Sequence, residues 1–312
     1  MRIVRDYQFT SPEDRGAAAA IGNFDGVHLG HISVIELTRA KAREAGAPLG
    51  VLTFEPHPRE YFAPDAPPFR LTGSEARASR LAKLGVEMLY ELNFNAALAA
   101  LTPEGFARDV IRDGLGLAHV VVGQDFCFGK GRAGNVADLE RFGREMGFGV
   151  TVAPMHREGE TRVSSTAIRE ALSEGRPRDA AKLLGHWHRI EGPVVGGEQR
   201  GRLLGYPTAN MSIEGLHPPR FGVYAVLVDV ADGPHAGHYM GAASIGVRPQ
   251  FGLNTPNLET YLIDFAGDLY GTHLSVALVE FLRPEAAFES VEALVAQMER
   301  DVARARDVLE AP

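Results

Sequence analysis

The first half of the chain alternates short apolar runs with helical patterns, and this alternation restricts the fold more than any other feature of the sequence. The strand-like runs are almost continuously apolar, which is typical of a parallel sheet covered on both faces. We therefore predict an α/β fold with a doubly wound, Rossmann-like sheet whose ligand lies beyond the carboxyl ends of the strands. The predicted strands span 17–21, 49–54, 88–92, 118–122 and 149–153, and the predicted helices span 30–45, 74–84, 103–113 and 137–146.

A different pattern begins near residue 190. Strand-like runs are separated there by Gly, Pro, Asn and Asp, and no helical pattern follows until residues 290–309. This order predicts an antiparallel β-barrel or sandwich closed by a terminal helix. A helical segment over 166–184 precedes the change, so we expect an N-terminal domain over 1–185 and a C-terminal domain over 186–312. The predicted strands of the second domain span 223–230, 239–245, 258–265 and 274–281.

Composition sets wider limits on the function. A length of 312 residues fits about two domains, and the net charge of -8 gives no electrostatic reason to expect nucleic acid or an anionic membrane as a partner. The single cysteine, Cys127, excludes an intramolecular disulfide and fits a reducing compartment. The N-terminus lacks the apolar core of a signal peptide, and no run approaches membrane-spanning length. We therefore expect a cytoplasmic protein.

A glycine-rich loop follows the first predicted strand and opens a helix. Its glycines let backbone amides approach phosphates, and the helix N-terminus adds the positive end of a dipole. His28 and His31 share one face of the first turn, where two imidazole donors could stabilise charge on a transferring phosphate. Without a Gly-Lys-Ser/Thr sequence, the chemistry need not be at a γ-phosphate. The loop reads Gly22-Asn23-Phe24-Asp25-Gly26-Val27-His28-Leu29-Gly30-His31.

Two other interpretations of the histidines remain open. A buried histidine commonly fills the core of a protein with its hydrogen bonds satisfied, and a histidine pair at a helix start can form half of a zinc site. No cysteine lies nearby to complete such a zinc site, and the glycines directly after a strand favour phosphate binding over a plain turn.

Three further motifs follow in order: Thr53-Phe54-Glu55-Pro56-His57-Pro58, Gly123-Gln124-Asp125-Phe126-Cys127-Phe128-Gly129 and Val163-Ser164-Ser165-Thr166-Ala167-Ile168-Arg169. Together with the first loop, the chain resembles the prokaryotic riboflavin kinase/FAD synthetases, whose first half is similar to nucleotidyltransferases with a His-x-Gly-His motif after strand one. Taken alone, the serines could be only a helix cap, and His57 could only shape a loop. The resemblance implies His28 and His31 as catalytic residues. As nucleotide- or flavin-binding residues it implies Gly22, Asn23, Phe24, Asp25, Gly26, Gly30, His57, Asp125, Phe126, Phe128, Gly129, Ser164, Ser165, Thr166 and Arg169.

One position departs from the family pattern in this half. The family has arginine where this chain has Cys127. The change removes a positive donor near the expected flavin or phosphate pocket, so we expect an effect on FMN adenylylation.

The second half carries another loop, Gly201-Arg202-Leu203-Leu204-Gly205-Tyr206-Pro207-Thr208-Ala209-Asn210. Thr208 and Asn210 alternate on an extended segment, so their oxygens can point the same way. A hydroxyl and an amide carbonyl suit Mg²⁺, which bridges to ATP phosphates. By chance alone such a string is a turn into a strand, but here it resembles the riboflavin kinase signature. The resemblance implies Thr208 and Asn210 as metal ligands, and Gly201, Gly205, Pro207 and Arg283 as binding residues.

The same resemblance assigns the base of the kinase reaction. Residues 258–265 match the strand that carries it, so Glu259 would accept the proton of the ribityl 5′-hydroxyl. Without the family match, Glu259 would read as a surface residue of an alternating strand. Ser244, Gln250 and Tyr261 depart from the residues that are common in the family.

The resemblance implies a bifunctional enzyme with two ATP sites. ATP and riboflavin give FMN and ADP, and ATP and FMN then give FAD and pyrophosphate, with Mg²⁺ as the metal. Two alternatives remain: a monofunctional FMN adenylyltransferase whose second domain only binds flavin, and a flavin carrier without activity. The expected partners are ATP, riboflavin, FMN and FAD, while FAD-requiring apoproteins are candidates and the oligomeric state is open.

Overall fold

The computed structural model describes residues 1–155, 157–158, 161–196, 204–247 and 256–311. The chain forms two compact units. The first unit contains Met1–Ala66 and Arg77–Val163, and the second contains Pro67–Ala76 and Ser164–Pro312. The expected domain boundary near residue 185 stays a prediction.

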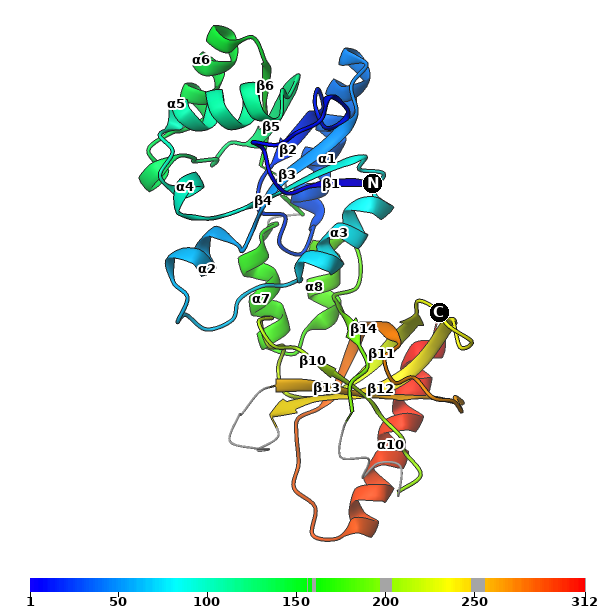
Figure 1. Ribbon diagram of the computed structural model, residues 1–312. Coiled ribbons are helices and arrows are strands. Elements are labelled where there is room, and N and C mark those ends of the chain that lie inside the picture. The colour runs from blue at the N-terminus through cyan, green and yellow to red at the C-terminus, as the bar shows by residue number, and fades with distance from the viewer. Residues whose placement is uncertain (156, 159–160, 197–203, 248–255, 312) are drawn as a thin grey trace. The chain divides into compact units, whose positions relative to one another are not determined.

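The first unit is built on a six-stranded sheet in which every paired strand is parallel. The strand order is β1-β4-β3-β2-β5-β6, with helices on both faces (Figure 1). The predicted doubly wound sheet is confirmed, and the three-residue strand β1 adds an edge that the sequence did not indicate. The strands are β1 (Arg2–Val4), β2 (Ala18–Ile21), β3 (Leu49–Glu55), β4 (Met88–Asn93), β5 (His119–Gly123) and β6 (Gly149–Ala153).

Alternate residues of β2 explain why the strands are apolar throughout. Ala19 and Ile21 belong to one buried cluster, whereas Ala18 and Ala20 belong to another. Both sheet faces are therefore buried, as continuous apolar runs require. The α-helices of this part of the chain are α1 (Leu29–Ala45), α2 (Pro58–Phe62), α3 (Ser74–Lys83), α4 (Ala96–Ala99), α5 (Pro103–Gly105) and α6 (Val136–Met146).

Two helical predictions need correction. The predicted helix over 103–113 is the short α5 followed by a π-helix, Phe106–Gly114, which ends with the Leu115 amide donating to the Val110 carbonyl. The predicted segment over 166–184 is two helices, α7 (Ser165–Ser173) and α8 (Pro177–Leu184). Gly175 has φ +74° and Pro177 begins α8, so the chain turns between them.

The second unit contains a six-stranded antiparallel barrel with the order β10-β13-β12-β11-β14-β9. The Val195 amide donates to the Asn210 carbonyl over 2.8 Å, which joins the two ends of the sheet. The barrel, and not a sandwich, is therefore the architecture of this unit. The strands are β9 (Arg189–Pro193), β10 (Ala209–Ser212), β11 (Gly222–Val230), β12 (Gly237–Val247), β13 (Pro256–Leu262) and β14 (His273–Arg283).

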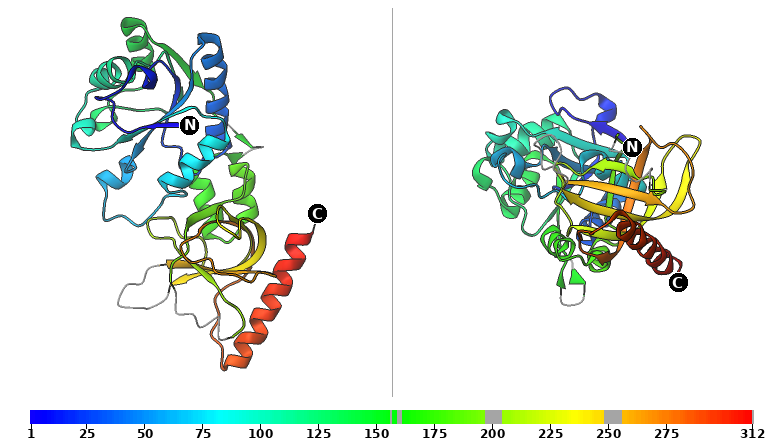
Figure 2. Two further views of the ribbon diagram at one scale, coloured as in Figure 1. Left: turned by 45° about the vertical axis from the view of Figure 1, so that its right-hand side comes forward. Right: turned by 90° about the horizontal axis from the view of Figure 1, so that it is seen from below.

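The terminal helix α10 (Val291–Glu310) lies against the outside of the barrel, as Figure 2 shows. Apolar residues of β11, β12 and β14 pack against its Ala305 in a cluster separate from the barrel interior. The barrel thus has two apolar surfaces, and the outer one can form a pocket beneath the helix. Residues 157–158 and 161–162 pair as the short strands β7 and β8 in the first unit.

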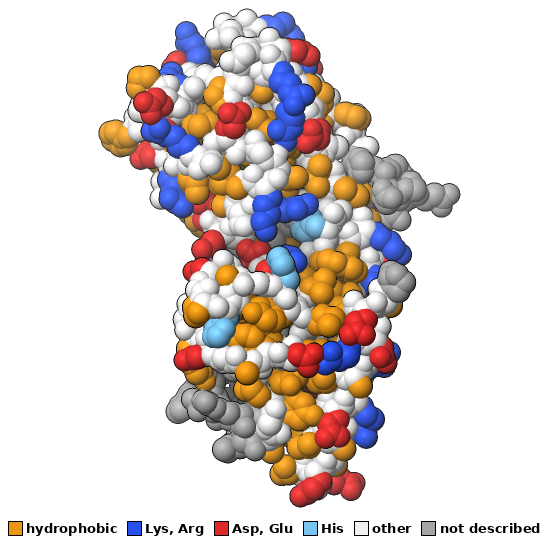
Figure 3. Space-filling view, turned by 90° about the vertical axis from the view of Figure 1, so that its right-hand side faces the viewer, with side chains coloured by type: hydrophobic (Ala, Val, Ile, Leu, Met, Phe, Trp, Pro, Cys, Tyr) orange, Lys and Arg blue, Asp and Glu red, His pale blue; other side chains and the backbone are white. Residues whose placement is uncertain are grey.

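Acidic and basic side chains are interspersed within each unit on the face drawn in Figure 3. Within the described part of the chain, no helix is both long enough and apolar enough to span a membrane.

Candidate active sites

The first site lies where the order of the parallel sheet reverses. The chain runs outward from β2 through β3 to β4 on one side, and then crosses to β5 and β6 on the other side of β2. The loop after β2 carries the histidines, and the loop after β5 carries the Asp125 motif, so the two motifs flank this switch point. Open α/β sheets bind their ligands at this place.

The loop after β2 has an unusual backbone that burial holds in place. Phe24, Gly26 and Val27 have φ values of 51°, 82° and 44°, and the left-handed region is unfavourable for a β-branched residue such as Val27. Phe24 is 1% and Val27 0% exposed, and both pack in the core beside β2. The Thr53 hydroxyl also donates to the Asn23 carbonyl over 3.1 Å. The fold therefore fixes this loop before any substrate binds.

His28 and His31 are stacked at the start of α1. Their ring centroids are 3.6 Å apart with an interplanar angle of 12°, and the His28 Nδ1 accepts the His31 backbone N–H over 3.2 Å. His28 is thus the N-cap of α1. A Cβ at Gly30 would lie 3.1 Å from the His28 ring, so Gly30 permits the stacked arrangement.

Hydrogen bonding constrains the His28 imidazole, and burial constrains that of His31. Because His28 Nδ1 accepts a hydrogen bond, its proton stands on Nε2 when the ring is neutral. Burial, together with the neighbouring His28, lowers the pKa of His31 well below its usual value. Nδ1 of His31 is buried and has no hydrogen-bond partner among the described residues. The pair therefore offers imidazole N–H donors to a phosphate, and the lowered pKa of His31 favours its neutral form.

The other predicted residues of this site follow β3 and β5. His57 is 9% exposed and is the N-cap of α2, where its Nδ1 accepts the Arg59 N–H over 3.0 Å. Asp125 is exposed, and a Cβ at Gly123 would lie 3.3 Å from its Oδ1. Cys127 is half-buried between Phe126 and Phe128 in sequence. Gly129 has φ +73° and ends this loop beside Pro103.

A row of aromatic rings runs along the same edge, and the sequence analysis missed most of it. Phe126 and Phe128 stack with centroids 5.5 Å apart, and the row continues through Phe106 to Phe54. From Phe54 it reaches Phe94, Tyr61 and Phe62, and the last is 67% exposed. An aromatic row beside a phosphate-binding loop can hold a planar ring system.

The fourth motif belongs to the second unit. Ser164 is the N-cap of α7, and its hydroxyl accepts the Ala167 N–H over 3.2 Å. The Arg169 guanidinium lies over the Phe69 ring, 5.3 Å from its centroid, and donates to the Phe69 carbonyl. The contribution of Ser164, Ser165, Thr166 and Arg169 to the first site stays a prediction.

The second site is arranged by strand register. Glu259 in β13 lies directly opposite Asn210 in β10 and Ser244 in β12, so the three side chains lie on one face. Asn257 donates from Nδ2 to Glu259 Oε1 over 3.0 Å, and Asn210 donates from Nδ2 to the Thr208 carbonyl over 3.2 Å. Glu259 is 9% exposed. The barrel thus gathers the predicted base and both predicted metal ligands in one place.

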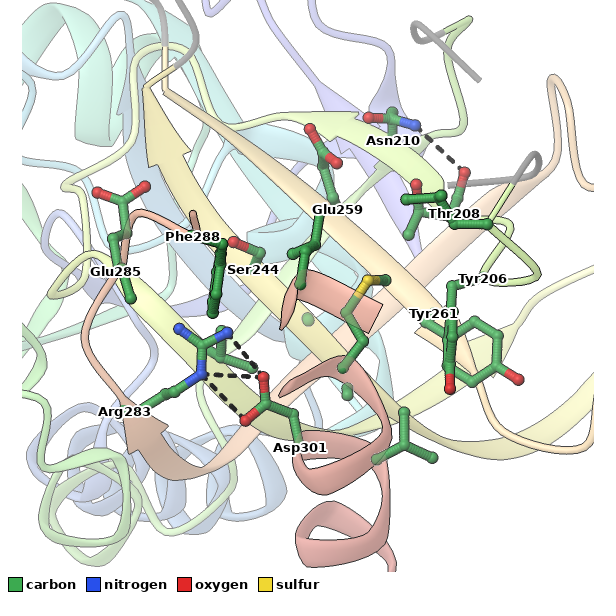
Figure 4. A pocket seen from close by; sticks show the side chains of 18 of the residues that line it. Tyr206, Thr208, Asn210, Ser244, Glu259, Tyr261, Arg283, Glu285, Phe288 and Asp301 are labelled. Carbon is green, nitrogen blue, oxygen red and sulfur yellow. Dashed lines mark hydrogen bonds and ion pairs between the residues drawn. The ribbon is translucent and has the colours of Figure 1, made fainter. Parts of the chain in front are cut away.

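Two cavities meet at Thr208 and Asn210. The larger, of about 670 Å³, also contains Glu259 and is bounded by α10 (Figure 4). The smaller, of about 490 Å³, lies on the other side, along Pro207 and Phe265. Thr208 and Asn210 line both cavities. The two cavities therefore adjoin at these two residues.

Arg283 and Tyr261 line the larger cavity. Arg283 donates three hydrogen bonds of 2.7–3.0 Å to the Asp301 carboxylate on α10, which joins this helix to the end of β14. Tyr261, at a position where histidine is common, lies 5.1 Å from Tyr206 between ring centroids. Gly205 has φ +84°, whereas Gly201 and Gln250 lie outside the described residues.

The first site combines a glycine-rich loop and a histidine pair on a parallel sheet, and the second combines a carboxylate, a hydroxyl and an amide on a barrel. These features define a two-part transferase that acts on phosphates at two places. Residues 10–167 match the family described as FAD synthetase, and residues 184–309 match the family described as riboflavin kinase. The chain belongs to the bifunctional riboflavin kinase/FMN adenylyltransferase family.

Curated relatives match along almost the whole chain. The bifunctional riboflavin kinase/FMN adenylyltransferase of Pseudomonas fluorescens is 42% identical over 98% of this chain and 97% of its own length. The protein of the same description from Escherichia coli K12 is 38% identical over the same shares. A crystal structure described as a macrolide-efflux protein from Streptococcus pneumoniae is 29% identical, with a TM-score of 0.84 over 100% of this chain and 99% of that one.

The protein is therefore an enzyme with two activities. It phosphorylates riboflavin to FMN with ATP, and it adenylylates FMN to FAD with a second ATP. Its substrates are riboflavin, FMN and ATP, and an enzyme of this kind requires a divalent metal. Both family matches favour the bifunctional interpretation over a monofunctional adenylyltransferase.

Proposed function

We propose that riboflavin phosphorylation takes place where the two barrel cavities meet. The observation that carries this proposal is that Thr208 and Asn210 line both of them, with Glu259 in the larger. Riboflavin occupies the larger cavity and ATP the smaller. The ribityl 5′-hydroxyl attacks the γ-phosphorus, its proton passes to Glu259, and the bond to the ADP oxygen breaks.

The metal of this reaction is Mg²⁺, held by the Thr208 hydroxyl and the Asn210 carbonyl oxygen. Mg²⁺ prefers oxygen ligands, keeps several waters and is commonly bound through few protein groups and the substrate phosphates. The donor set fits, because both side chains carry neutral oxygens at the junction of the cavities. When bound, the ion draws charge from the γ-phosphate. Thr208 and Asn210 would hold it where the two cavities adjoin.

Adenylyl transfer takes place at the switch point of the parallel sheet. An FMN phosphate oxygen attacks the α-phosphorus of ATP, and the bond to pyrophosphate breaks. N–H donors from His28 and His31 and the N-terminus of α1 stabilise the charge that develops on the α-phosphate. Asp125 and His57 line the same edge and contact the nucleotide or flavin.

The aromatic row along this edge holds the isoalloxazine ring of FMN. Phe54, Phe106 and Phe128 connect the buried part of the row to the exposed Phe62. Planar rings stack well on such side chains.

The two activities belong to different domains in this proposal. We assign adenylyl transfer to residues 1–185 and the kinase to residues 186–312. ATP and a free Cys127 fit the cytoplasm, and FAD-requiring apoproteins are the expected recipients of the product.

Filling one cavity at a time tests the substrate assignment in the barrel. Met298 lines only the larger cavity and Ala266 only the smaller. We expect Met298→Trp to raise KM for riboflavin by at least about tenfold, equal to about 1.4 kcal/mol, without changing KM for ATP. Ala266→Trp should do the reverse. If the two effects were exchanged, the substrates would have been assigned to the wrong cavities.

A further inference from the structure

A buried ionic cluster lies beneath the first site and takes no part in the chemistry described above. The Arg77 side chain is 1% exposed, and its Nη2 lies 2.8 Å from Glu55 Oε2 and 2.8 Å from Glu91 Oε2. Glu91 lies within β4 and is 3% exposed, whereas Glu55 is the last residue of β3 and is 32% exposed. Arg77 Nη2 therefore connects β4, in the core, to Glu55, where the loop after β3 begins.

The pairing of β3 and β4 brings these groups to one face of the sheet. Thr53 lies directly opposite Glu91, and Glu55 follows Thr53 by two residues, so all three side chains lie on the same face. Thr53 is fully buried and donates to the Asn23 carbonyl in the loop after β2. The same face of β3 thus holds the histidine loop through Thr53 and the start of the next loop through Glu55.

Only Pro56 separates Glu55 from His57. His57 caps α2 with its ring, and its backbone N–H donates to Glu60 Oε2 over 3.1 Å. These contacts fix His57 relative to α2. Glu55, at the start of the same turn, is held through its carbonyl, which accepts the Phe94 N–H over 2.9 Å, and through its carboxylate, which pairs with Arg77.

Stability alone gives little reason for such a cluster. Desolvation of buried charges offsets most of their attraction, and apolar side chains of similar size commonly serve stability as well. A bridging guanidinium does restrict the position of both carboxylates. A displacement of about 1 Å at a reacting group can lower a rate about 100-fold.

We propose that Arg77 is a positioning residue for FMN adenylylation. It acts through Glu55 to hold the loop after β3, which contains His57, in position at the switch point of the sheet. The inference rests on the proposed role of the loops after β2 and β3 in adenylyl transfer. Packing of the almost fully buried Arg77 side chain holds it in place, so in this proposal the Arg77–Glu55 pair does not depend on Glu91.

Matched substitutions separate this role from a structural one. Glu55→Leu cuts the tether and leaves the Arg77–Glu91 pair, whereas Glu91→Leu leaves the Arg77–Glu55 pair. We expect Glu55→Leu to lower kcat/KM for FAD formation from FMN by about 30-fold or more. Glu91→Leu should stay within about twofold, even though Glu91 is the more buried carboxylate. Glu55→Gln keeps an acceptor oxygen and should recover most of the lost rate.

The double variant Arg77→Leu/Glu91→Leu distinguishes positioning from direct contact. It removes Arg77 together with Glu91, the more buried of its two carboxylate partners, and keeps Glu55. The proposal requires the double variant to be as slow as Glu55→Leu. A double variant as fast as the wild type would show that Glu55 contacts substrate itself, and equal losses in Glu55→Leu and Glu91→Leu would show a structural role only; either result overturns the proposal.

Two controls accompany these assays on the full chain. FMN formation from riboflavin reports whether each variant has folded, and we expect it to remain within about twofold of the wild type. His28→Asn tests the proposed function separately. If it kept FAD formation, the site assignment would fail; if it lost FAD formation while Glu55→Leu did not, only the positioning role would fail.

Discussion

The two sites reach similar chemistry from different kinds of backbone. The proposed adenylyltransferase site is built on loops at the ends of parallel strands, which include residues with positive φ such as Phe24 and Val27. The proposed kinase site is built on the strands themselves, where Asn210 and Ser244 both lie opposite Glu259 in register. The geometry of a loop depends on contacts with buried side chains beneath the loop, whereas strand register is fixed by the hydrogen bonds between the strands. We therefore expect remote substitutions to impair the first site more readily than the second.

The largest expected effect is the loss of Glu259, the proposed base of the kinase reaction. Glu259→Gln keeps the size and a hydrogen-bond acceptor but cannot take the ribityl proton. Riboflavin phosphorylation should fall by about 1000-fold, within the usual range for a general base. Adenylylation of added FMN should stay unchanged, as measured by chromatography of FMN and FAD. Loss of both activities would contradict the separation of the sites.

The next effect sharpens the comparison on the loop side. His28→Asn keeps an oxygen that can cap α1 but removes the imidazole donor, so FAD formation should fall by about 100-fold. His28→Ala also removes the cap, which costs about 1 kcal/mol of stability. Thermal unfolding of the two variants separates the contribution of the helix cap to stability from the contribution of the imidazole to the rate of FAD formation. Equal FAD formation in His28→Asn and the wild type would leave the helix cap as the only role of His28.

The buried His188 makes the stability of the protein depend on pH. Burial, with smaller effects from His186 and His217, lowers the pKa of His188 to about 3. Between pH 6.5 and 3 the unfolded chain binds a proton that the folded side chain does not, so stability is full above pH 6.5 and is lost as the pH falls. The loss approaches about 1.4 kcal/mol per pH unit.

His188→Gln removes this proton and should flatten the pH dependence of unfolding. The single tryptophan, Trp187, is adjacent in sequence, so its fluorescence in urea reports on this region. We expect the wild type to lose about 2 kcal/mol more than the variant between pH 7 and pH 5. Equal losses would mean that other groups, among them His31, account for the acid sensitivity.

The smallest expected effect concerns the departure at Cys127. Cys127→Arg restores the positive donor of the family pattern in a half-exposed loop. An exposed charge contact is worth about 0.5–1 kcal/mol, so kcat/KM for FMN adenylylation should rise about two- to fivefold. Cys127→Gln is the uncharged control. A rise with glutamine as large as that with arginine would exclude a charge effect.

Much of the fold could be predicted because apolar patterns mark buried strands directly. The five main strands of the parallel sheet match their predicted positions to within a residue or so at each end. The strand β9 was missed because it is short and carries polar residues, which gives no clear period, whereas only the start of β10 was indicated, as an extended segment at Thr208 and Asn210. The break between α7 and α8 depends on Gly175, and isolated glycines are tolerated in helices often enough to be overlooked.

The sites, like the fold, could be predicted only in part. The spacing of His28 and His31 predicts a shared helix face, and the structure stacks their rings. The aromatic row could not be predicted, because Phe54, Phe94 and Phe106 come from separate segments and each reads as an ordinary core residue. The contact between Arg77 and Glu55 likewise depends on a tertiary approach of α3 to β3 that no local pattern indicates.

The claim that one chain holds two independent sites is tested most directly by mixing two variants. His28→Asn and Glu259→Gln are each incubated with riboflavin, ATP and Mg²⁺, alone and as an equimolar mixture, and the flavins are separated by chromatography. We expect His28→Asn to stop at FMN, Glu259→Gln to leave riboflavin, and the mixture to produce FAD. A mixture that produces no FAD, although each variant is folded, would contradict two separate sites.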